Sequence, residues 1–533
     1  MGRLARAEQT QQMDVFEFFT SSLEECKQIA ATLVEVGCCA RCLLRFLGES
    51  KSSSYKYSYQ NVYDVLGLER SSNVNSVQDC PCPSCLGILQ KYADNLFLSK
   101  ILQKVQDDSY EFSDYQCSLI LPVCIAIRQR AIHIFLKKKF GVIYSVQEDK
   151  LPTVKDIWKW SCGFKVGELL SAQFQNKSGF DILMTFTYPE SNKECSFLLD
   201  TFPDVFKKRK QRKYGFETFT RANVAKALID MDDSKFEDCT SCPPSVPIAE
   251  CSCEITCTHE PVFVAGRYQK YSRVLSQTPW IVEGKRVMEG SVEELICDPI
   301  LNTFKPSDHR FSSSGREDVD VRMLGDGRPF IVELINPHCV IFSTQDMSLL
   351  QEKINSCSKD VQVRDLQIVS REDTAILKDG EISKTKCYSA ECWCERPLTE
   401  TDLVKLAGIK DLVLQQKTPL RVLHRRTAAT RERLIHSLSA KVLSDKLFKL
   451  NLNTQAGTYI KEFVHSDFGR TTPNLGELLG AECDIINLDV ESVDVDWPPK
   501  INLSIGEKNI SSTSAETINY TDAEQNEESA DKT

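Results

Sequence analysis

Residues 232–260 separate two stretches of sequence with different patterns, so the chain is expected to form more than one domain. Asp, Ser, Pro and Cys dominate this segment, and neither a helical nor a strand period runs through it. A chain of 533 residues is also too long for a single hydrophobic core. We predict an accessory domain over residues 12–250, a second domain over residues 254–500 and a disordered acidic tail over residues 506–533.

The first predicted domain mixes helices and strands. Apolar residues spaced along one helical face predict a helix over residues 14–36, and Cys82 opens a second predicted helix. Residues 115–125 and 180–188 have the composition of strands. The pattern before the boundary therefore indicates an accessory domain of the α/β type.

The second predicted domain is richer in strands. Strand-like runs lie at residues 262–265, 330–335, 361–368 and 447–452, with helical patterns between them. Ser291, with Glu294 three residues later, forms a capping box that begins one of these helices. The expected fold class is α+β.

Composition sets limits on location and partners. The chain has 23 cysteines and no secretory signal, which favours a reducing compartment with thiols available as metal ligands. No apolar run is long enough to span a bilayer, so we expect no membrane partner. The net charge of −10 argues against general nucleic-acid binding, although it conceals basic runs such as residues 207–213 and 421–426.

Two Cys-x-x-Cys pairs, Cys39 with Cys42 and Cys82 with Cys85, predict a metal site. Four thiolates suit tetrahedral zinc in a closed structural site. The alternative is that these are small buried residues in a cysteine-rich chain. A second cluster over residues 239–259 has irregular spacing and more ligands than one ion needs, which favours a cysteine-rich linker over a second site.

Two basic segments predict RNA contacts. Residues 266–273 interleave three cations with two tyrosines, and residues 416–426 carry further arginines around Val422 and Leu423, which we place in a strand. Cations bind phosphates and aromatic rings stack on unpaired bases. The alternative for each segment is a solvated charged loop.

The densest charge in the chain lies at residues 315–322, with the sequence GREDVDVR. This run holds three carboxylates and two arginines, and glycines flank it. A carboxylate beside cations stays ionised and can act as a nucleophile, so the run predicts a loop at a functional site. Farther on, residues 454–470 predict a strand that turns into a helix at Gly457, with Lys461 and Phe468 two turns apart on that helix.

These motifs together resemble the pseudouridine synthases. The sequence GTYIK at residues 457–461 stands where that superfamily has Gly-Thr-Tyr-Ile-Arg, with Lys461 replacing the arginine. Lys386 and Tyr388 match its Lys-x-Tyr motif, and GRED at residues 315–318 matches the loop of its essential aspartate. Further motifs, densest over residues 254–500, are similar to those of the archaeal–eukaryotic tRNA pseudouridine synthase ten family.

The resemblance implies a catalytic domain with a mixed or antiparallel sheet, behind an accessory domain with a THUMP-like RNA-binding module and a structural zinc site. It implies an isomerase that needs no cofactor for its chemistry. The implied substrate is tRNA, at uridine 55 or 54 of the TΨC arm, and other structured RNAs are further candidates. We also expect a monomer located in the nucleus and the cytoplasm.

The resemblance also assigns roles to residues. Asp318 is the expected nucleophile or charge-stabilising carboxylate, with Glu317 and Asp320 as competitors. Lys461 is expected to pair with Asp318, while Tyr388 and Ile460 are expected to pack on the flipped base. The candidate RNA contacts are Arg267, Tyr268, Lys270, Arg273, Arg316, Arg322, Arg421, Arg425 and Arg426.

Other functions remain open from the sequence. A non-catalytic RNA-binding adaptor would use the same zinc module and basic surfaces. A zinc-dependent hydrolase or deaminase is disfavoured because no His-x-Glu motif precedes the Pro-Cys-x-x-Cys run at residues 81–85. A methyltransferase is disfavoured because the sequence has no Gly-x-Gly-x-x-Gly loop.

Overall fold

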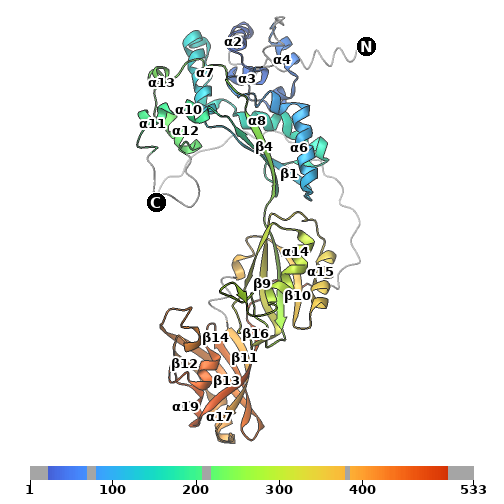
Figure 1. Ribbon diagram of the computed structural model, residues 1–533, viewed down its shortest axis with the longest axis vertical. Coiled ribbons are helices and arrows are strands. Elements are labelled where there is room, and N and C mark those ends of the chain that lie inside the picture. Colours follow the sequence, from blue (N-terminus) through green and yellow to red (C-terminus); the bar gives the residue numbers. More distant parts are fainter. Residues whose placement is uncertain (1–21, 69–79, 207–217, 378–384, 502–533) are drawn as a thin grey trace, which may run out of the picture.

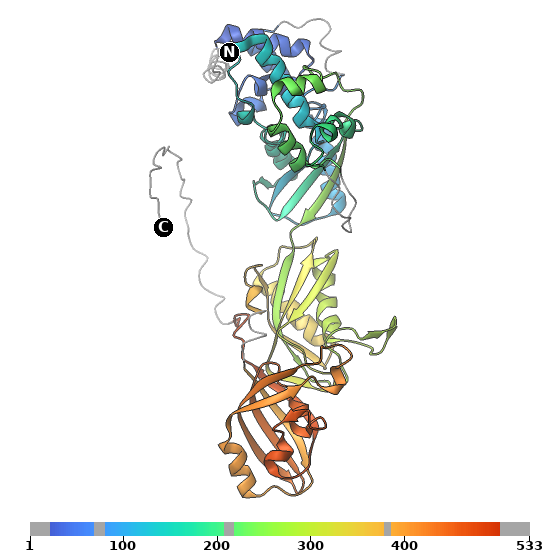
Figure 2. The same ribbon diagram turned by 90° about the vertical axis from the view of Figure 1, so that its left-hand side faces the viewer.

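The protein is elongated, with an accessory part and a second, strand-rich part joined at a narrow connection (Figures 1 and 2). The computed structural model describes residues 22–68, 80–206, 218–377 and 385–501. The predicted tail at residues 506–533, the basic run at residues 207–213 and the start of the first predicted helix lie outside this range. In the described ranges, no helix is long and apolar enough to cross a membrane.

The accessory part combines helices with a small sheet of four strands. The sheet has the strand order β2-β1-β3-β4, and β1 pairs in parallel with both β2 and β3. Its strands are β1 (Asp114–Ile120), β2 (Gln173–Phe174), β3 (Phe180–Thr187) and β4 (Ser252–His259). The helices are α2 (Leu23–Glu35), α3 (Ala40–Phe46), α4 (Tyr59–Val65), α6 (Asn95–Asp108), α7 (Cys124–Phe140), α8 (Val154–Trp158), α9 (Phe164–Leu170), α10 (Ser191–Glu194), α11 (Phe197–Thr201), α12 (Arg221–Ile229) and α13 (Asp233–Cys239).

The prediction of a helix from Cys82 onward is wrong. Leu86 and Gly87 have φ values of 55° and 81°, which a right-handed helix cannot contain. The helix begins only at Asn95, after Asp94 caps it by accepting a hydrogen bond from the backbone of Phe97.

A mixed sheet of ten strands forms the frame of the second part. Its order is β10-β5-β9-β16-β11-β14-β13-β12-β15, with β8 added beside β9, and only β9 and β16 pair in parallel among these strands. The strands are β5 (Val262–Lys270), β8 (Asp308–Ser313), β9 (Arg322–Ile335), β10 (Val361–Val369), β11 (Thr385–Cys394), β12 (Lys410–Lys417), β13 (Thr430–Ser444), β14 (Leu447–Gln455), β15 (Thr471–Thr472) and β16 (Cys483–Val493). The expected α+β class and mixed sheet are confirmed.

Helices and a small hairpin complete this part. The helix predicted from the capping box is present, with Ser291 as its N-cap. The helices are α14 (Val292–Phe304), α15 (Thr344–Cys357), α17 (Glu400–Gly408), α18 (Ile460–His465) and α19 (Leu475–Leu479), and the hairpin pairs β6 (Ile281–Val282) with β7 (Lys285–Arg286).

Two separate cores place the domain boundary. One core of buried side chains runs from Cys26 to Cys257, and the other begins at Phe263. Strand β4 belongs to the accessory sheet through its pairing with β3, whereas β5 belongs to the large sheet. The boundary therefore lies at residues 260–261, slightly after the start that we predicted at residue 254.

A small set of contacts joins the two domains. The Tyr110 and His338 rings stack with their centroids 4.0 Å apart. Asn336 accepts hydrogen bonds from the Tyr110 hydroxyl at 3.0 Å and from the His259 amide at 2.8 Å. These contacts lie beside the covalent connection, so they fix the direction in which the accessory domain leaves the large sheet.

Arg267 joins the chain that follows β16 to the large sheet. It is 5% exposed, and its guanidinium donates hydrogen bonds to the carbonyls of Asp326, Gly327, Val495 and Trp497 at 2.7–2.9 Å. The prediction that Arg267 contacts RNA is therefore corrected: this side chain is a structural cross-link between a turn and the chain after β16.

Replacing Arg267 by Met is expected to lower the unfolding free energy of this domain by roughly 3 kcal/mol or more, because four carbonyls lose a charged donor. The measurement is the urea midpoint of the full chain, followed by circular dichroism. The control is Arg310→Met, since the Arg310 side chain is 69% exposed. Equal midpoints for the two variants would contradict the structural role of Arg267.

Candidate functional site

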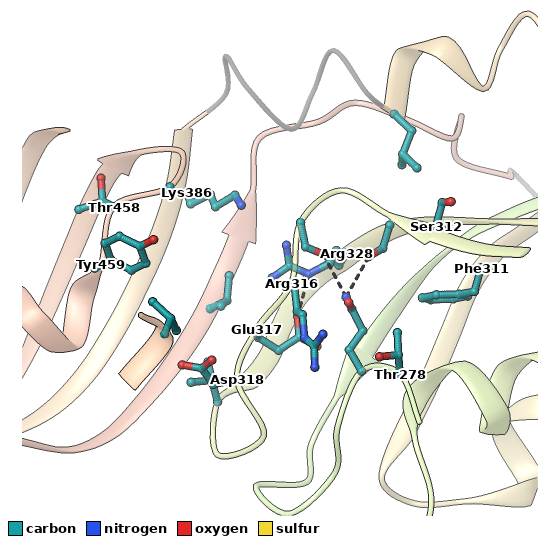
Figure 3. A pocket seen from close by; sticks show the side chains of 18 of the residues that line it. Thr278, Phe311, Ser312, Arg316, Glu317, Asp318, Arg328, Lys386, Thr458 and Tyr459 are labelled. Carbon is teal, nitrogen blue, oxygen red and sulfur yellow. Dashed lines mark hydrogen bonds and ion pairs between the residues drawn. The ribbon is translucent and has the colours of Figure 1, made fainter. Parts of the chain in front are cut away.

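The large sheet has two halves: β10, β5, β9 and β8 form one, and β16, β11, β14, β13, β12 and β15 form the other. A cavity of about 750 Å³ opens where these two halves meet. The acidic loop at residues 315–321 forms one wall, and the strands and loops around Lys386 and Tyr459 form the facing wall (Figure 3). All four residues that the sequence assigns to catalysis line this cavity: Asp318, Tyr388, Ile460 and Lys461. The structure thus brings together motifs separated by more than a hundred residues.

A buried ion pair holds the acidic loop in place. Arg328 Nε donates to Glu317 Oε2 at 2.8 Å, and the two side chains are 2% and 0% exposed. The Tyr268 hydroxyl donates to the same carboxylate, and Gln277 in turn donates to the Tyr268 oxygen at 2.7 Å and to the Gly315 carbonyl at 3.0 Å. Glu317 is therefore committed to the support of the loop, which removes it as a competitor for the catalytic role.

Gly315 is required by its surroundings. Its φ is +89°, and a Cβ placed there would lie 2.9 Å from Lys386 Nζ and 3.0 Å from Arg328 Nη1. The glycine lets the loop pass these two cations closely.

Lys270 fixes the backbone on which Asp318 sits. Its amino group is buried and donates to the carbonyls of Leu275, Asp318 and Val319 at 2.8–3.1 Å. Burial lowers the pKa of Lys270 to about 8, because the charged form loses its hydration. Tyr268 and Lys270 are both 0% exposed, so our prediction that they contact RNA is corrected: they hold the loop from inside.

Two cations share the carboxylates of Asp318 and Asp320. Arg421 Nη1 donates to Asp318 Oδ2 at 2.8 Å, whereas Lys461 Nζ lies 3.6 Å from the same oxygen. Lys461 donates to Asp320 at 2.7 Å. Partial burial acts to raise the pKa of Asp320, but the hydrogen bond from Lys461 lowers it, and the pKa is lowered overall. The pairing of Lys461 with Asp318 is thus present, but the shorter contact to Asp318 comes from Arg421.

Glu462 holds Arg421 from behind, and the sequence reasoning did not identify it. Arg421 Nε donates to Glu462 Oε1 at 2.7 Å, and the Glu462 side chain is 2% exposed. A signal for Glu462 was available in the sequence, because this carboxylate directly follows Lys461 inside the third motif. Its position next to a candidate catalytic residue could have marked it as a partner for one of the cations. Arg421 therefore bridges a buried carboxylate and the candidate catalytic one.

The third motif has the predicted strand-to-helix turn. Strand β14 ends at Gln455 and α18 begins at Ile460, while Gln416 brackets the turn by bonding both the amide and the carbonyl of Tyr459 at 2.9 Å. Beside it, burial raises the pKa of Tyr388 to about 12, which keeps its phenol protonated at neutral pH.

Two of the candidate RNA-binding arginines instead join parts of the sheet. Arg273 and Arg322 both donate to Asp489 on β16, at 2.7 Å and 2.6–2.9 Å. Arg273 also donates to the carbonyls of Asp320 and Leu488 at 2.9 Å. With their donors engaged in this way, the two side chains join the halves of the sheet. They are 28% and 37% exposed, so their contact with RNA stays a prediction.

The remaining candidate arginines line the open cavity. Arg316, Arg425 and Arg426 are exposed and lie on its wall, in company with Arg431 and Arg433. The segment that carries several of them is not a strand as predicted, since Leu420–Val422 forms a short 3-10 turn after Pro419. The exposed lining of the cavity is therefore strongly cationic, and Asp318 lies among these arginines on its wall.

The four predicted metal ligands lie together in the accessory domain. The sulfurs of Cys39, Cys42, Cys82 and Cys85 are all within 4.8 Å of one another, and all four side chains are buried. Cys39 Sγ lies 3.8 Å from Cys85 Sγ, which matches the separation of roughly 3.8 Å expected for thiolates about 2.3 Å from one tetrahedral ion. The Cys39 amide also donates to Cys82 Sγ at 3.4 Å, a contact that favours a thiolate. The group can hold a metal ion.

The second cysteine cluster does not gather in the same way. Over the residues that the structure describes, the four-cysteine group is the one set of ligands found close enough to hold an ion. Cys253 and Cys257 lie on β4 and Cys239 ends α13, so the cluster is divided among separate elements.

Sequence comparisons match nearly the whole chain. A family model described as "Eukaryotic Pus10, N-terminal" matches residues 82–257, and one described as "Pus10, C-terminal" matches residues 263–494. The tRNA pseudouridine synthases Pus10 of Homo sapiens and Xenopus laevis are each 42% identical to the chain, over 90% of its length and 99% of theirs. A chain from the crystal structure of a Cbf5–Nop10–Gar1 complex has 14% identity and a TM-score of 0.24, over 42% of this chain and 47% of that one, which is too low to support an inference.

Lys270 provides a pH-dependent prediction. Its folded pKa of about 8 lies below the ordinary 10.5, so between these values the unfolded chain binds more protons than the folded chain. Its contribution to the unfolding free energy therefore rises with pH across this window, by on the order of 3 kcal/mol. Urea titrations of wild type and Lys270→Met from pH 7.5 to 10.5 measure this as a difference between the two proteins. A difference that stays flat or falls with pH would show that folding does not lower the pKa of Lys270.

Proposed function

Because the chain belongs to the Pus10 family, we propose that it is a tRNA pseudouridine synthase that isomerises uridine 55, uridine 54 or both in the TΨC arm. The observation that carries the proposal is the position of Asp318. Its carboxylate lies at a cavity wall between Arg421 and Lys461, and Tyr388 and Ile460 line the same cavity.

The reaction breaks the bond between N1 of uracil and C1′ of ribose, turns the base and joins C5 to C1′. C5 then loses its proton and N1 gains one, so no atom is gained or lost overall. Cleavage develops positive charge on the sugar, which a nearby carboxylate stabilises. Asp318 supplies this carboxylate, either by attack on the nucleotide or by assisting removal of a sugar proton. Arg421 and Lys461 orient it before the substrate arrives.

The cavity suits a base that has left its stack. A uridine in a folded arm must be flipped out to reach Asp318, and a flipped base is held by packing on aromatic or apolar side chains. Tyr388 and Ile460 supply such surfaces, and the Tyr388 hydroxyl is available as a proton donor. Arg316, Arg425 and Arg426 lie at the rim, where they can neutralise phosphates of the flanking nucleotides.

We further propose that the four-cysteine group binds zinc in a structural role. Four thiolates leave no open coordination position for a reacting water, so the ion would join α3 to the turns at Cys82 and Cys85 rather than take part in catalysis. The same closed set of ligands argues against a zinc-dependent hydrolase or deaminase.

The accessory domain is proposed to bind tRNA outside the target nucleotide, through a module of the THUMP type. We propose that the protein acts as a monomer in the nucleus and the cytoplasm, with tRNA as its main partner. A non-catalytic adaptor is the alternative, and the carboxylate at the cavity wall distinguishes the two because an adaptor does not need it.

Asp318→Asn is expected to reduce tritium release from tRNA carrying 5-tritiated uridine by at least about three orders of magnitude, because the amide cannot stabilise the developing charge. Binding of the same tRNA, measured by filter retention, should change little. Asp320→Asn is the matched control, since Asp320 is the more exposed carboxylate at 63% against 33%, and it should retain most activity. Full activity of Asp318→Asn would reject the assignment, and carbodiimide mapping of the wild-type product would locate the modified uridine.

Zinc is expected at one ion per chain when the purified protein is measured by plasma mass spectrometry. Cys82→Ser should lose the ion and lower the melting temperature of the accessory domain, because the thiolates are buried and lose their shared partner. Cys80→Ser is the control, since Cys80 is exposed and outside the group. Zinc retained at full occupancy in Cys82→Ser would contradict this site.

A further inference from the structure

Phe468 is an aromatic side chain that the fold leaves outside every core. It is 91% exposed, and it lies three residues after the end of α18. The sequence predicted Phe468 on the same helix as Lys461, but α18 ends at His465. The ring is not buried by the fold, so it is available to a ligand.

The backbone around Phe468 is held in an unusual conformation. Ser466, Asp467 and Phe468 have φ values of 66°, 50° and 58°, so three successive residues with side chains lie in the left-handed region. The Ser466 carbonyl accepts bonds from the amides of Arg470 and Thr471 at 3.0 and 3.1 Å. Such strain persists where surrounding contacts fix it, and it occurs often at ligand-binding sites. Here it holds the ring outward.

The loop with Phe468 packs directly on the segment that carries Arg421. Asp467 is 7% exposed and accepts a bond from the Leu420 amide at 3.2 Å. Arg470 donates to the Thr418 carbonyl at 2.6 Å. These two bonds hold the loop that carries Phe468 against Thr418 and Leu420, directly before Arg421 in the chain.

We propose that Phe468 is a stacking platform for an unpaired base of the RNA substrate, adjacent to the uridine that enters the cavity. This inference rests on the proposed function. An exposed aromatic ring on a loop held against an arginine-rich segment matches the chemistry of single-stranded RNA, whose bases stack on aromatic faces while cations neutralise the phosphates. Leu420, whose amide bonds to Asp467, is 47% exposed, and the arginines that follow it at positions 421, 425 and 426 favour RNA over an apolar protein partner.

The test measures binding and catalysis with a TΨC-arm RNA hairpin and the full-length protein. Phe468→Ala is expected to raise the dissociation constant by roughly 5- to 150-fold, the loss of one stacked base, and to raise KM while kcat at saturation is preserved. Phe468→Tyr should bind like wild type because it keeps the ring. Val404→Ala is the control, since Val404 is also exposed, at 72%, but lies on α17.

A tryptophan at this position gives a direct readout of stacking. The chain already has five tryptophans, so the signal of the new one is the difference in fluorescence between Phe468→Trp and wild type. This difference should decrease when the hairpin binds, because a stacked base quenches tryptophan. An unchanged dissociation constant for Phe468→Ala, or no quenching in Phe468→Trp, would overturn the stacking role. Failure of the proposed function is distinguishable, because wild type would then bind the hairpin but release no tritium.

Discussion

The buried ion pair between Glu317 and Arg328 determines where the candidate catalytic carboxylate lies. Charges removed from water are costly unless each finds its partner, and here Tyr268 and Arg328 satisfy Glu317 while Arg328 also donates to the Ser314 carbonyl. The pair anchors the residue immediately before Asp318 to β9. Asp318 therefore projects from a fixed point, although its loop has no regular secondary structure.

The neighbouring carboxylates differ in their surroundings more than in their chemistry. Glu317 is sealed beneath the loop, and Asp320 is the more exposed partner of Lys461. Asp318 lies between these extremes, one-third exposed and contacted by two cations, at the wall of a cavity large enough for a nucleoside. Glu462 is a buried acidic side chain behind Arg421, and its bond to the Arg421 Nε leaves Nη1 to reach Asp318. The selection among three acidic residues thus follows from packing.

The sequence predicted the motifs and the fold class, but not which cations are buried. The run at residues 266–273 has alternating cations and tyrosines, which is equally the pattern of a strand with both faces covered. Strand β5 pairs with β9 and β10, so Arg267 and Lys270 turn inward to carbonyls that need donors. Such long-range partners are set by chain topology, which local residue patterns do not contain. The same reason concealed the partner of Glu462, since Arg421 is 41 residues away. It also concealed the end of α18 at His465, after which Asp467 bonds to the Leu420 amide.

The shape of the cavity depends on a narrow seam between the two halves of the sheet. Strands β9 and β16 pair in parallel through only two residue pairs, Arg322 with Asp489 and Met323 with Val490. Arg322 and Arg273 both bond to the Asp489 carboxylate across this seam, and Arg273 also holds the Asp320 carbonyl. Asp318 belongs to one half, whereas Tyr388 and Lys461 belong to the other. The cluster around Asp489 therefore sets the distance from the Asp318 carboxylate to Tyr388 and Lys461. This distance matters for catalysis because a misplacement of about 1 Å between reacting groups is enough to slow a reaction strongly.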